Sequence, residues 1–241
     1  MDQLLVALDV ESGRRALELA DRLTGIVGGF KVGSRLFTFE GPALVSELVA
    51  RGARVFLDLK FHDIPNQVAQ AVAAAVHTGA WMVDVHASGG RAMMEAAVKA
   101  GREAALQVGR PMPLVVGVTV LTSMDQNMLA ETGVGRPLLD QVVSLAQLAK
   151  SADLQGVVAS PHEIRAIRQA CGGEFAIVTP GIRGASAGGA MNDQMRTMGP
   201  AEAIRAGASY LVIGRPIIAA PDPRGAAQKI AEELNEARGS G

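Results

Sequence analysis

Three opposed charges lie close together where an apolar segment of the chain ends. The segment RVFLDLK, residues 54–60, runs into Phe-His-Asp, so Asp58, Lys60 and Asp63 follow one another closely. Side chains alternate between the two faces of a β-strand, and Asp58 and Lys60 therefore share one face with Phe56. An ammonium held beside a carboxylate away from water is a candidate proton donor, because Coulomb interactions are stronger there than in bulk water. The spacing also fits a buried structural ion pair, since such networks shift pKa values as catalytic ones do.

The elements that must position these charges follow a repeated pattern. Short runs rich in Val, Ile and Leu alternate with longer Ala-rich segments that carry Glu, Arg and Gln, which is typical of βα units. Strands are predicted at residues 4–10, 29–34, 54–60, 81–87, 114–121, 156–160, 175–182 and 210–217. Eight parallel strands in 241 residues favour an α/β fold of the (β/α)8 TIM barrel type over an open doubly wound sheet. No linker or change of composition divides the chain, so residues 1–241 are predicted to form a single domain.

Polar residues collect at the carboxyl ends of the predicted strands, where barrel enzymes carry their chemistry. In strand order they are Asp9, Lys31, Asp58 with Lys60, His86, and Thr122 with Ser123. Because the first three strands are neighbours in a barrel, Asp9, Lys31, Asp58 and Lys60 are expected to meet as four charges without net charge. Alternation does not extend to the loop that carries Asp63, so its direction is left open. His86 fits either a core histidine or a general base.

The loops after the last two predicted strands are candidates for a phosphate site. In this fold such loops bind phosphate together with the amino end of a short helix. The first loop is rich in glycine and carries Arg183, while the second reads Gly214-Arg215-Pro216, with a planar guanidinium and a proline suited to a first helical turn. Residues 181–194 form a connection long enough to act as a lid. Glycine and proline that merely shape tight turns are the alternative.

Composition excludes several classes of function. The formal net charge is −1 and aromatic residues make up 3% of the chain, which leaves neither a basic surplus nor stacking platforms for nucleic acid. No apolar stretch reaches the roughly 18 residues of a membrane span, and no signal sequence is recognisable, so a cytoplasmic protein is expected. Cys171 stands alone, so neither an internal disulfide nor a zinc cluster is expected. Each carboxylate near the predicted barrel mouth has a lysine competitor, which disfavours a metal ion.

The chain resembles the bacterial orotidine 5′-phosphate decarboxylase family from about Leu4 to Ile218. The motifs that carry the resemblance are ALDV with Asp9, KVG with Lys31, DLKFHDIPN at residues 58–66, VHASGG with His86, VLTS with Thr122, TPGIR with Arg183, NDQ with Gln194 and IGRPI with Arg215. The long motif followed by the others in order is specific, whereas Asp-x-Lys-x-x-Asp alone is not. The resemblance implies decarboxylation of orotidine 5′-monophosphate to UMP in pyrimidine biosynthesis, by a homodimer of barrels without cofactor or metal.

The resemblance also implies roles for single residues. Lys60 protonates C6 of the pyrimidine as carbon dioxide leaves, Asp58 lies beside the departing carboxylate, and Asp63 and Lys31 continue the charged network. Asp63 and Ile64 enter the neighbouring subunit's site. The implied substrate contacts are Asp9 and Lys31 with ribose, Thr122 and Ser123 with the base, Gln194 with base and phosphate, and Arg183, Gly214 and Arg215 with phosphate. Gln67 stands where many relatives carry a threonine that reaches the ribose from the partner, so its contact is left open.

Three other readings of the same residues stay open. A sugar-phosphate decarboxylase or aldol-type synthase on this fold uses a similar Asp-x-Lys-x-x-Asp with Mg²⁺, although the continuation Ile-Pro-Asn here is of the orotidylate type. A Schiff-base aldolase through Lys60 requires a lowered lysine pKa, which neighbouring carboxylates oppose. The third is a barrel that binds a nucleotide without turnover.

Overall fold

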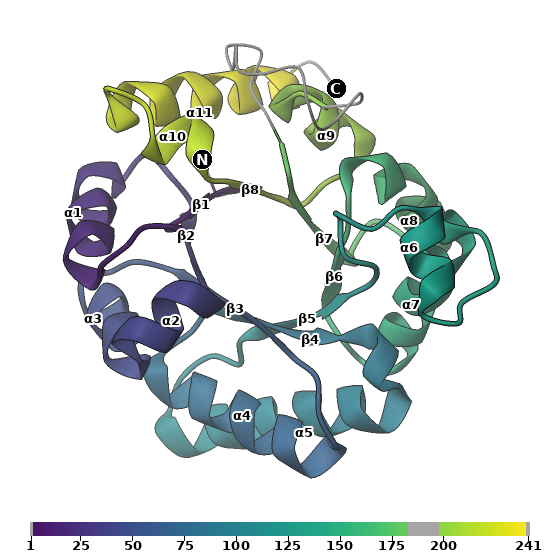
Figure 1. Cartoon of the computed structure of the whole chain (residues 1–241). Helices are drawn as coiled ribbons and strands as arrows, with labels where there is room; N and C mark the ends of the chain where they lie inside the picture. Colours follow the sequence, from purple (N-terminus) through teal and green to yellow (C-terminus); the bar gives the residue numbers. More distant parts are fainter. Residues whose placement is uncertain (1, 183–197, 240–241) are drawn as a thin grey trace.

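The computed structural model describes residues 2–182 and 198–239, and these form a closed parallel barrel. Strand β1 pairs with β2 on one side and β8 on the other, which closes the sheet (Figure 1). The strands are β1 Leu4–Ala7, β2 Gly29–Gly33, β3 Val55–Phe61, β4 Met82–His86, β5 Leu114–Val118, β6 Gly156–Val158, β7 Ala176–Pro180 and β8 Tyr210–Ile213. The predicted single-domain (β/α)8 barrel is therefore confirmed.

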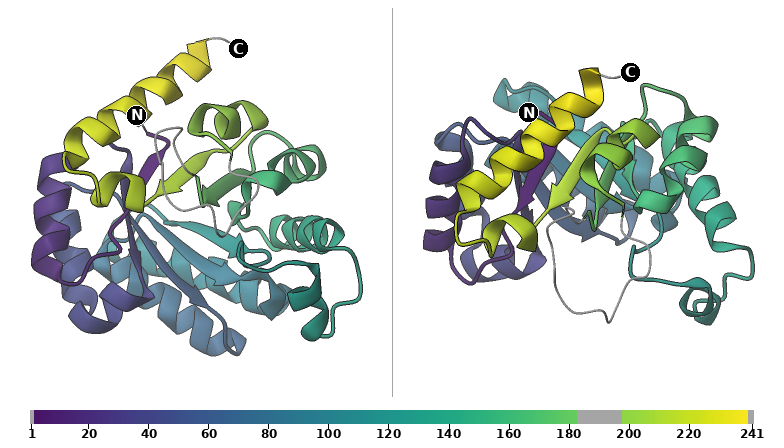
Figure 2. Two further views of the ribbon diagram at one scale, coloured as in Figure 1. Left: turned by 45° about the horizontal axis from the view of Figure 1, so that its top comes forward. Right: turned by 90° about the horizontal axis from the view of Figure 1, so that it is seen from above.

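Helices surround the barrel on its outside (Figures 1 and 2). They are α1 Gly13–Leu23, α2 Ser34–Glu40, α3 Pro42–Ala50, α4 Pro65–Thr78, α5 Arg91–Val108, α6 Gln126–Glu131, α7 Leu138–Ser151, α8 Ile164–Cys171, α9 Pro200–Ala206, α10 Arg215–Ile218 and α11 Pro223–Gly239. Two short 3-10 helices, η1 Ala87–Gly89 and η2 Pro161–Glu163, follow β4 and β6. Within the described ranges, no helix combines the length and apolar character needed to cross a membrane.

Alternation along the strands separates two apolar layers. The layer inside the barrel consists of Leu5, Ala7, Phe56, Met82, Val116, Val118, Val158, Val178 and Val212. Residues of the opposite parity, such as Leu4, Val6 and Leu57, pack outward against the helices. Lys31, Asp58 and Asp84 continue the inward-facing series toward the carboxyl ends of the strands. The inner apolar layer thus forms the floor beneath those charges.

Several predicted strands extend beyond the observed ones. Strand β1 ends at Ala7, so Asp9 lies in the following loop, and β8 ends at Ile213 before α10 begins. The predictions overran because apolar burial continues past the last paired residue, as at Leu8 with 0% and Val120 with 6% exposure. Strand β3 instead runs one residue further than predicted, to Phe61.

The amino end of the barrel is closed by a cation and two aromatic rings. The Arg54 guanidinium lies 4.6 Å from the ring centroid of Trp81, and Trp81 meets Tyr210 edge to face with centroids 5.2 Å apart. Arg54 also donates to the carbonyls of Gly28 (2.7 Å) and Asp2 (3.1 Å). Both rings pack against the inner apolar layer, so this end is stabilised by stacking and hydrogen bonds.

Candidate active site

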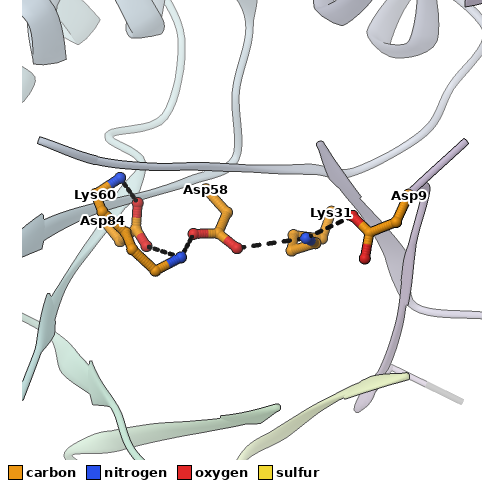
Figure 3. A network of polar contacts seen from close by, with 5 residues as sticks. All are labelled: Asp9, Lys31, Asp58, Lys60 and Asp84. Atoms are coloured by element: carbon orange, nitrogen blue, oxygen red, sulfur yellow. Dashed lines mark hydrogen bonds and ion pairs between the residues drawn. The ribbon is translucent and has the colours of Figure 1, made fainter. Parts of the chain in front are cut away.

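Five charged residues form one row across the carboxyl end of the barrel, which we call the charged array: Asp9, Lys31, Asp58, Lys60 and Asp84 (Figure 3). Lys31 Nζ lies 2.9 Å from Asp9 Oδ1 and 3.5 Å from Asp58 Oδ2. Lys60 Nζ makes a close ion pair with Asp58 Oδ1 and lies 4.0 Å from Asp84 Oδ2. The structure thus brings together the four charges expected from the sequence. Side-chain exposure is 59% at Asp9, 37% at Lys60 and 0% at Asp84, so the array has an exposed end at Asp9 and a fully buried end at Asp84.

Two glycines border the outer end of the charged array, and at Gly33 the missing side chain leaves room for Lys31. A Cβ at Gly33, the next inward-facing position after Lys31, would lie 3.1 Å from Lys31 Nζ. A Cβ at Gly214 would approach Ala7 to 3.4 Å and Asp9 Oδ2 to 3.7 Å. A side chain at Gly33 would therefore displace the Lys31 ammonium, since 3.1 Å is shorter than an ordinary van der Waals contact.

An irregularity in β3 sets the position of Lys60. Leu57 pairs with Val83 and Phe61 pairs with Val85, so three residues of β3 face the single residue Asp84 of β4. Such a bulge bends the strand and re-aims its side chains. Lys60 itself has a φ of 52°, in the left-handed region that non-glycine residues rarely occupy. The bulge draws Lys60 to the level of Asp84, where regular pairing would place it one layer higher.

Asp84 is the member of the charged array that sequence reasoning missed. Its Oδ1 accepts the backbone N–H of Lys60 at 2.8 Å. The expected four charges therefore have a fifth neighbour, a buried carboxyl group beside Lys60. A signal was present, because Asp84 is the lone carboxylate in the apolar run WMVDV and shares its inward-facing parity with Met82.

Burial and neighbouring charges shift the pKa values of three members of the charged array. Burial, followed by the charge of Asp58, raises the pKa of Asp84 well above its usual range. Burial also opposes ionisation of Asp58, but a hydrogen bond from Asp84 and the charges of Lys31 and Lys60 outweigh it, so the pKa of Asp58 is lowered. The Lys60 pKa is raised because the Asp58 carboxylate outweighs burial. Lys60 is therefore kept as an ammonium, as proton donation requires.

A cavity of about 170 Å³ opens beside Asp58 and Lys60. Its other lining residues are Lys31, Phe56, Val118, Val120, Leu121, Thr122, Val158, Pro180 and Val212. Ligand pockets are typically about 300–1,000 Å³, so this cavity suits a single ring with the remainder of a ligand extending outward. Its apolar wall faces the charged array, which gives one side of a bound ring a charged neighbour and the other an apolar one.

Two histidines lie beside this region. The ring centroids of His62 and His86 are 5.1 Å apart. Burial, followed by the charges of His62 and Lys60, lowers the pKa of His86, which favours the neutral imidazole. The structure leaves the choice between a core histidine and a general base untested.

The remaining predicted site residues lie around the mouth or outside the described ranges. Asp63, Ile64 and Gln67 are exposed where β3 leads into α4, and Asp63 Oδ1 accepts the N–H of Ile64 at 2.6 Å. Ion pairs between Asp63 and the lysines of the charged array do not occur within the described part of the single chain. Thr122, Ser123, Gly214 and Arg215 lie at the mouth, with Arg215 beginning α10 as expected. Arg183 and Gln194, and with them most of the predicted lid, lie outside the described residues.

The donor set of the charged array suits ion pairing more than metal binding. Among residues 2–182 and 198–239, no group of three His, Cys, Asp or Glu side chains is arranged to hold a metal ion. Each carboxylate of the array faces a lysine ammonium instead.

Comparison with known proteins places the whole barrel among its relatives. A family model described as the orotidine 5′-phosphate decarboxylase / HUMPS family matches residues 2–230. The orotidine 5′-phosphate decarboxylase of Moorella thermoacetica is 56% identical over 234 residues, covering 97% of this chain and 92% of the relative. That of Syntrophotalea carbinolica is 55% identical over 232 residues, covering 96% and 94%. The crystal structure of orotidine 5′-phosphate decarboxylase from Lactobacillus acidophilus has a TM-score of 0.86 at 35% identity, covering 97% and 99%. The residues matched by the family model include the entire charged array.

Proposed function

The chain belongs to the orotidine 5′-phosphate decarboxylase / HUMPS family, and on this premise we propose that it converts orotidine 5′-monophosphate to UMP, through a C6 carbanion that Lys60 protonates. The reaction is a step of pyrimidine biosynthesis. The observation that carries the mechanism is the position of the Lys60 ammonium, held between Asp58 and Asp84 at the edge of a ring-sized cavity.

The chemistry requires a fixed positive charge at one carbon atom. Loss of carbon dioxide breaks the bond between C6 and the carboxylate and leaves the electron pair on C6, which has no adjacent carbonyl to delocalise it. An ammonium directed at C6 stabilises that charge and then transfers a proton to it. The raised pKa of Lys60 keeps the proton available, and it disfavours a Schiff-base role, which requires a neutral amine.

We assign Asp58 mainly to positioning of Lys60. Its side chain is 13% exposed and pairs with both lysines of the charged array, so it fixes the two ammonium groups relative to each other. A carboxylate at this place also faces the substrate carboxylate. Repulsion between the two would raise the ground state, and this alternative predicts tighter substrate binding when Asp58 loses its charge.

The rest of the substrate follows from the cavity outward. With the base in the cavity beside Thr122 and Ser123, the ribose lies at Asp9 and Lys31, and the phosphate lies at Gly214 and Arg215 with Arg183 and Gln194.

We further propose a cytoplasmic homodimer in which Asp63 and Ile64 complete the partner's site, with Gln67 near its ribose. The 63% exposure of Ile64 in the single chain supports this placement, because a partner would cover it. Sedimentation of the purified protein at micromolar concentration as a species of twice the chain mass is expected.

The test is the fall in ultraviolet absorbance when orotidine 5′-monophosphate is mixed with the purified protein in the presence of EDTA. The parent protein is expected to turn the substrate over, and Lys60→Ala is expected to lose at least 10⁴-fold in kcat, at the upper end of general acid contributions. EDTA sensitivity or absence of turnover would overturn the proposal. A sugar phosphate with Mg²⁺ is then the next substrate to assay.

A further inference from the structure

Asp84 is a buried carboxyl group to which the proposed reaction assigns no step of its own. It lies in the centre of β4 with 0% exposure, and its Oδ2 as a carboxylate has no hydrogen-bond partner within the described residues. A buried, incompletely paired carboxylate costs several kcal/mol. Valine would fill the same position in a strand whose inward neighbour is Met82. The cost of burying Asp84 therefore indicates that this residue has a function that offsets it.

The hydrogen bond of Asp84 with the backbone supplies such a role. In a regular ladder, a backbone N–H of β3 donates to a carbonyl of a neighbouring strand. At the bulge between Leu57 and Phe61, the N–H of Lys60 instead donates to Asp84 Oδ1. A left-handed backbone at a non-glycine residue costs about 1–3 kcal/mol and persists only where its surroundings hold it. The Asp84 carboxyl is the side chain that holds Lys60 N–H in this conformation.

The same carboxyl lies close to the other end of the Lys60 side chain. Asp84 Oδ2 is 4.0 Å from Lys60 Nζ (Figure 3). Asp58, two residues before Lys60 in the same bulge, pairs with this ammonium through its Oδ1. A lysine side chain has four rotatable bonds above its Cα atom. Fixing the backbone at Lys60 therefore sets the direction in which its side chain leaves the strand. The carboxyl groups of Asp58 and Asp84 then restrict the position of the ammonium.

From this geometry we propose that Asp84 is a positioning residue for Lys60, which acts mainly through the hydrogen bond from Lys60 N–H to Asp84 Oδ1 and so holds the bulge that directs the ammonium into the cavity. The inference rests on the proposed function, since it assigns Asp84 to the proton donor of that reaction. Asp84 itself does not line the cavity.

Two substitutions at one position test the proposal. Asp84→Val removes the acceptor, and kcat for orotidine 5′-monophosphate is expected to fall about 100-fold, because a displacement near 1 Å of a reacting group costs that much. KM and the dissociation constant of UMP are expected to stay within about threefold, since Asp84 touches neither the mouth nor the cavity. Asp84→Asn retains an oxygen acceptor, and its kcat is expected to stay within about threefold of the parent. This rescue separates positioning from a general structural role.

Controls keep the outcomes distinct. Thr179→Val is the matched control, because Thr179 is a buried residue of β7 outside the site whose Oγ1 has no hydrogen-bond partner among the described residues. Its kcat is expected to equal that of the parent. If Asp84→Val does not fold, Asp84→Ala is measured in its place, with the same direction expected. The inference would be overturned if Asp84→Val, or Asp84→Ala in its place, had the kcat of the parent. It would also be overturned if kcat in Asp84→Asn were as low as in Asp84→Val. An inactive parent protein would instead overturn the proposed function.

Discussion

Two cations are held between strands at opposite ends of the barrel, and their surroundings differ. Arg54, at the amino end, stacks on Trp81 and donates to the carbonyls of Gly28 and Asp2. Lys60, at the carboxyl end, lies among carboxylates on a strand that is bulged and locally left-handed. The first cation is satisfied by an aromatic ring, two carbonyls and the exposed carboxylate of Asp2, which lies 3.5 Å away. The second is held by groups that are expensive to bury.

This difference indicates that the amino end of the barrel contributes mainly to stability and the carboxyl end mainly to the proposed chemistry. At the amino end the stacking and hydrogen bonds of Arg54 and Trp81 stabilise the fold, which is the usual role of that end of a barrel. At the carboxyl end, under the proposed mechanism, backbone strain and buried charge direct an ammonium at the place where negative charge develops. Substitutions at the two ends are therefore expected to affect different quantities.

After Lys60→Ala, the largest effect is expected from Asp58→Asn. Loss of this charge releases both lysines of the charged array, and kcat is expected to fall by about 10²–10⁴-fold. Under the positioning account, the dissociation constant of orotidine 5′-monophosphate changes by less than about tenfold, as measured with single-turnover kinetics. Substrate binding that tightens by more than this would favour ground-state repulsion instead.

Trp81→Ala tests the opposite end. The substitution removes the ring that lies between Arg54 and Tyr210, and the free energy of unfolding is expected to fall by about 2–3 kcal/mol, less than for a fully buried tryptophan. Thermal denaturation should show a Tm about 5–10 °C lower. The kcat measured well below that temperature should stay within twofold, and a large loss of kcat would break the division between the two ends.

Asp84→Asn is expected to stabilise the protein in a way that depends on pH. The pKa of Asp84 is raised above its ordinary value of 3.8, so the folded state keeps this proton to higher pH than the unfolded state. The stability of the parent therefore falls as pH rises from about 3.8 through the raised pKa, whereas the amide does not titrate. The Tm advantage of Asp84→Asn should be smallest near pH 4 and reach about 2–4 °C at neutral pH. Equal Tm values for the parent and Asp84→Asn across this pH range would show that ionisation of the buried Asp84 does not destabilise the folded protein.

The smallest effect is expected from Arg54→Lys. An ammonium keeps the charge but loses the planar stack on Trp81, and the expected cost is about 0.5–1 kcal/mol, or about 1–4 °C in Tm. Activity should be unchanged. A larger loss would mean that the hydrogen bond to the Gly28 carbonyl contributes more than the stack.

The barrel itself and most of the charged array could be predicted from the sequence. Strand periodicity placed Asp58 and Lys60 on one face, and neighbouring strands placed Lys31 and Asp9 beside them. These inferences hold because alternation and strand order are local rules that burial on both faces of a barrel enforces.

The bulge and the role of Asp84 could not be predicted in the same way. Regular alternation puts Lys60 on the correct face, yet the register shift between Leu57 and Phe61 depends on pairing with β4, which local sequence does not encode. Asp84 was visible as a polar residue in an apolar strand, but its partner is a backbone N–H freed by that shift. The sequence motif therefore contained the proposed proton donor without the bulge that we propose positions it.

The most direct test of a carbanion protonated by Lys60 uses the reverse of that proton transfer. UMP is incubated with the protein in D₂O, and deuterium at C6 is followed by NMR. The parent protein is expected to exchange the C6 hydrogen with solvent: the neutral amine of Lys60 takes the C6 proton, the resulting ammonium stabilises the carbanion, and after exchange with D₂O the ammonium returns a deuteron to C6. Lys60→Ala is expected to show no exchange above the rate without protein. Exchange that persists unchanged in Lys60→Ala would contradict the account, as would decarboxylation by the parent without any exchange.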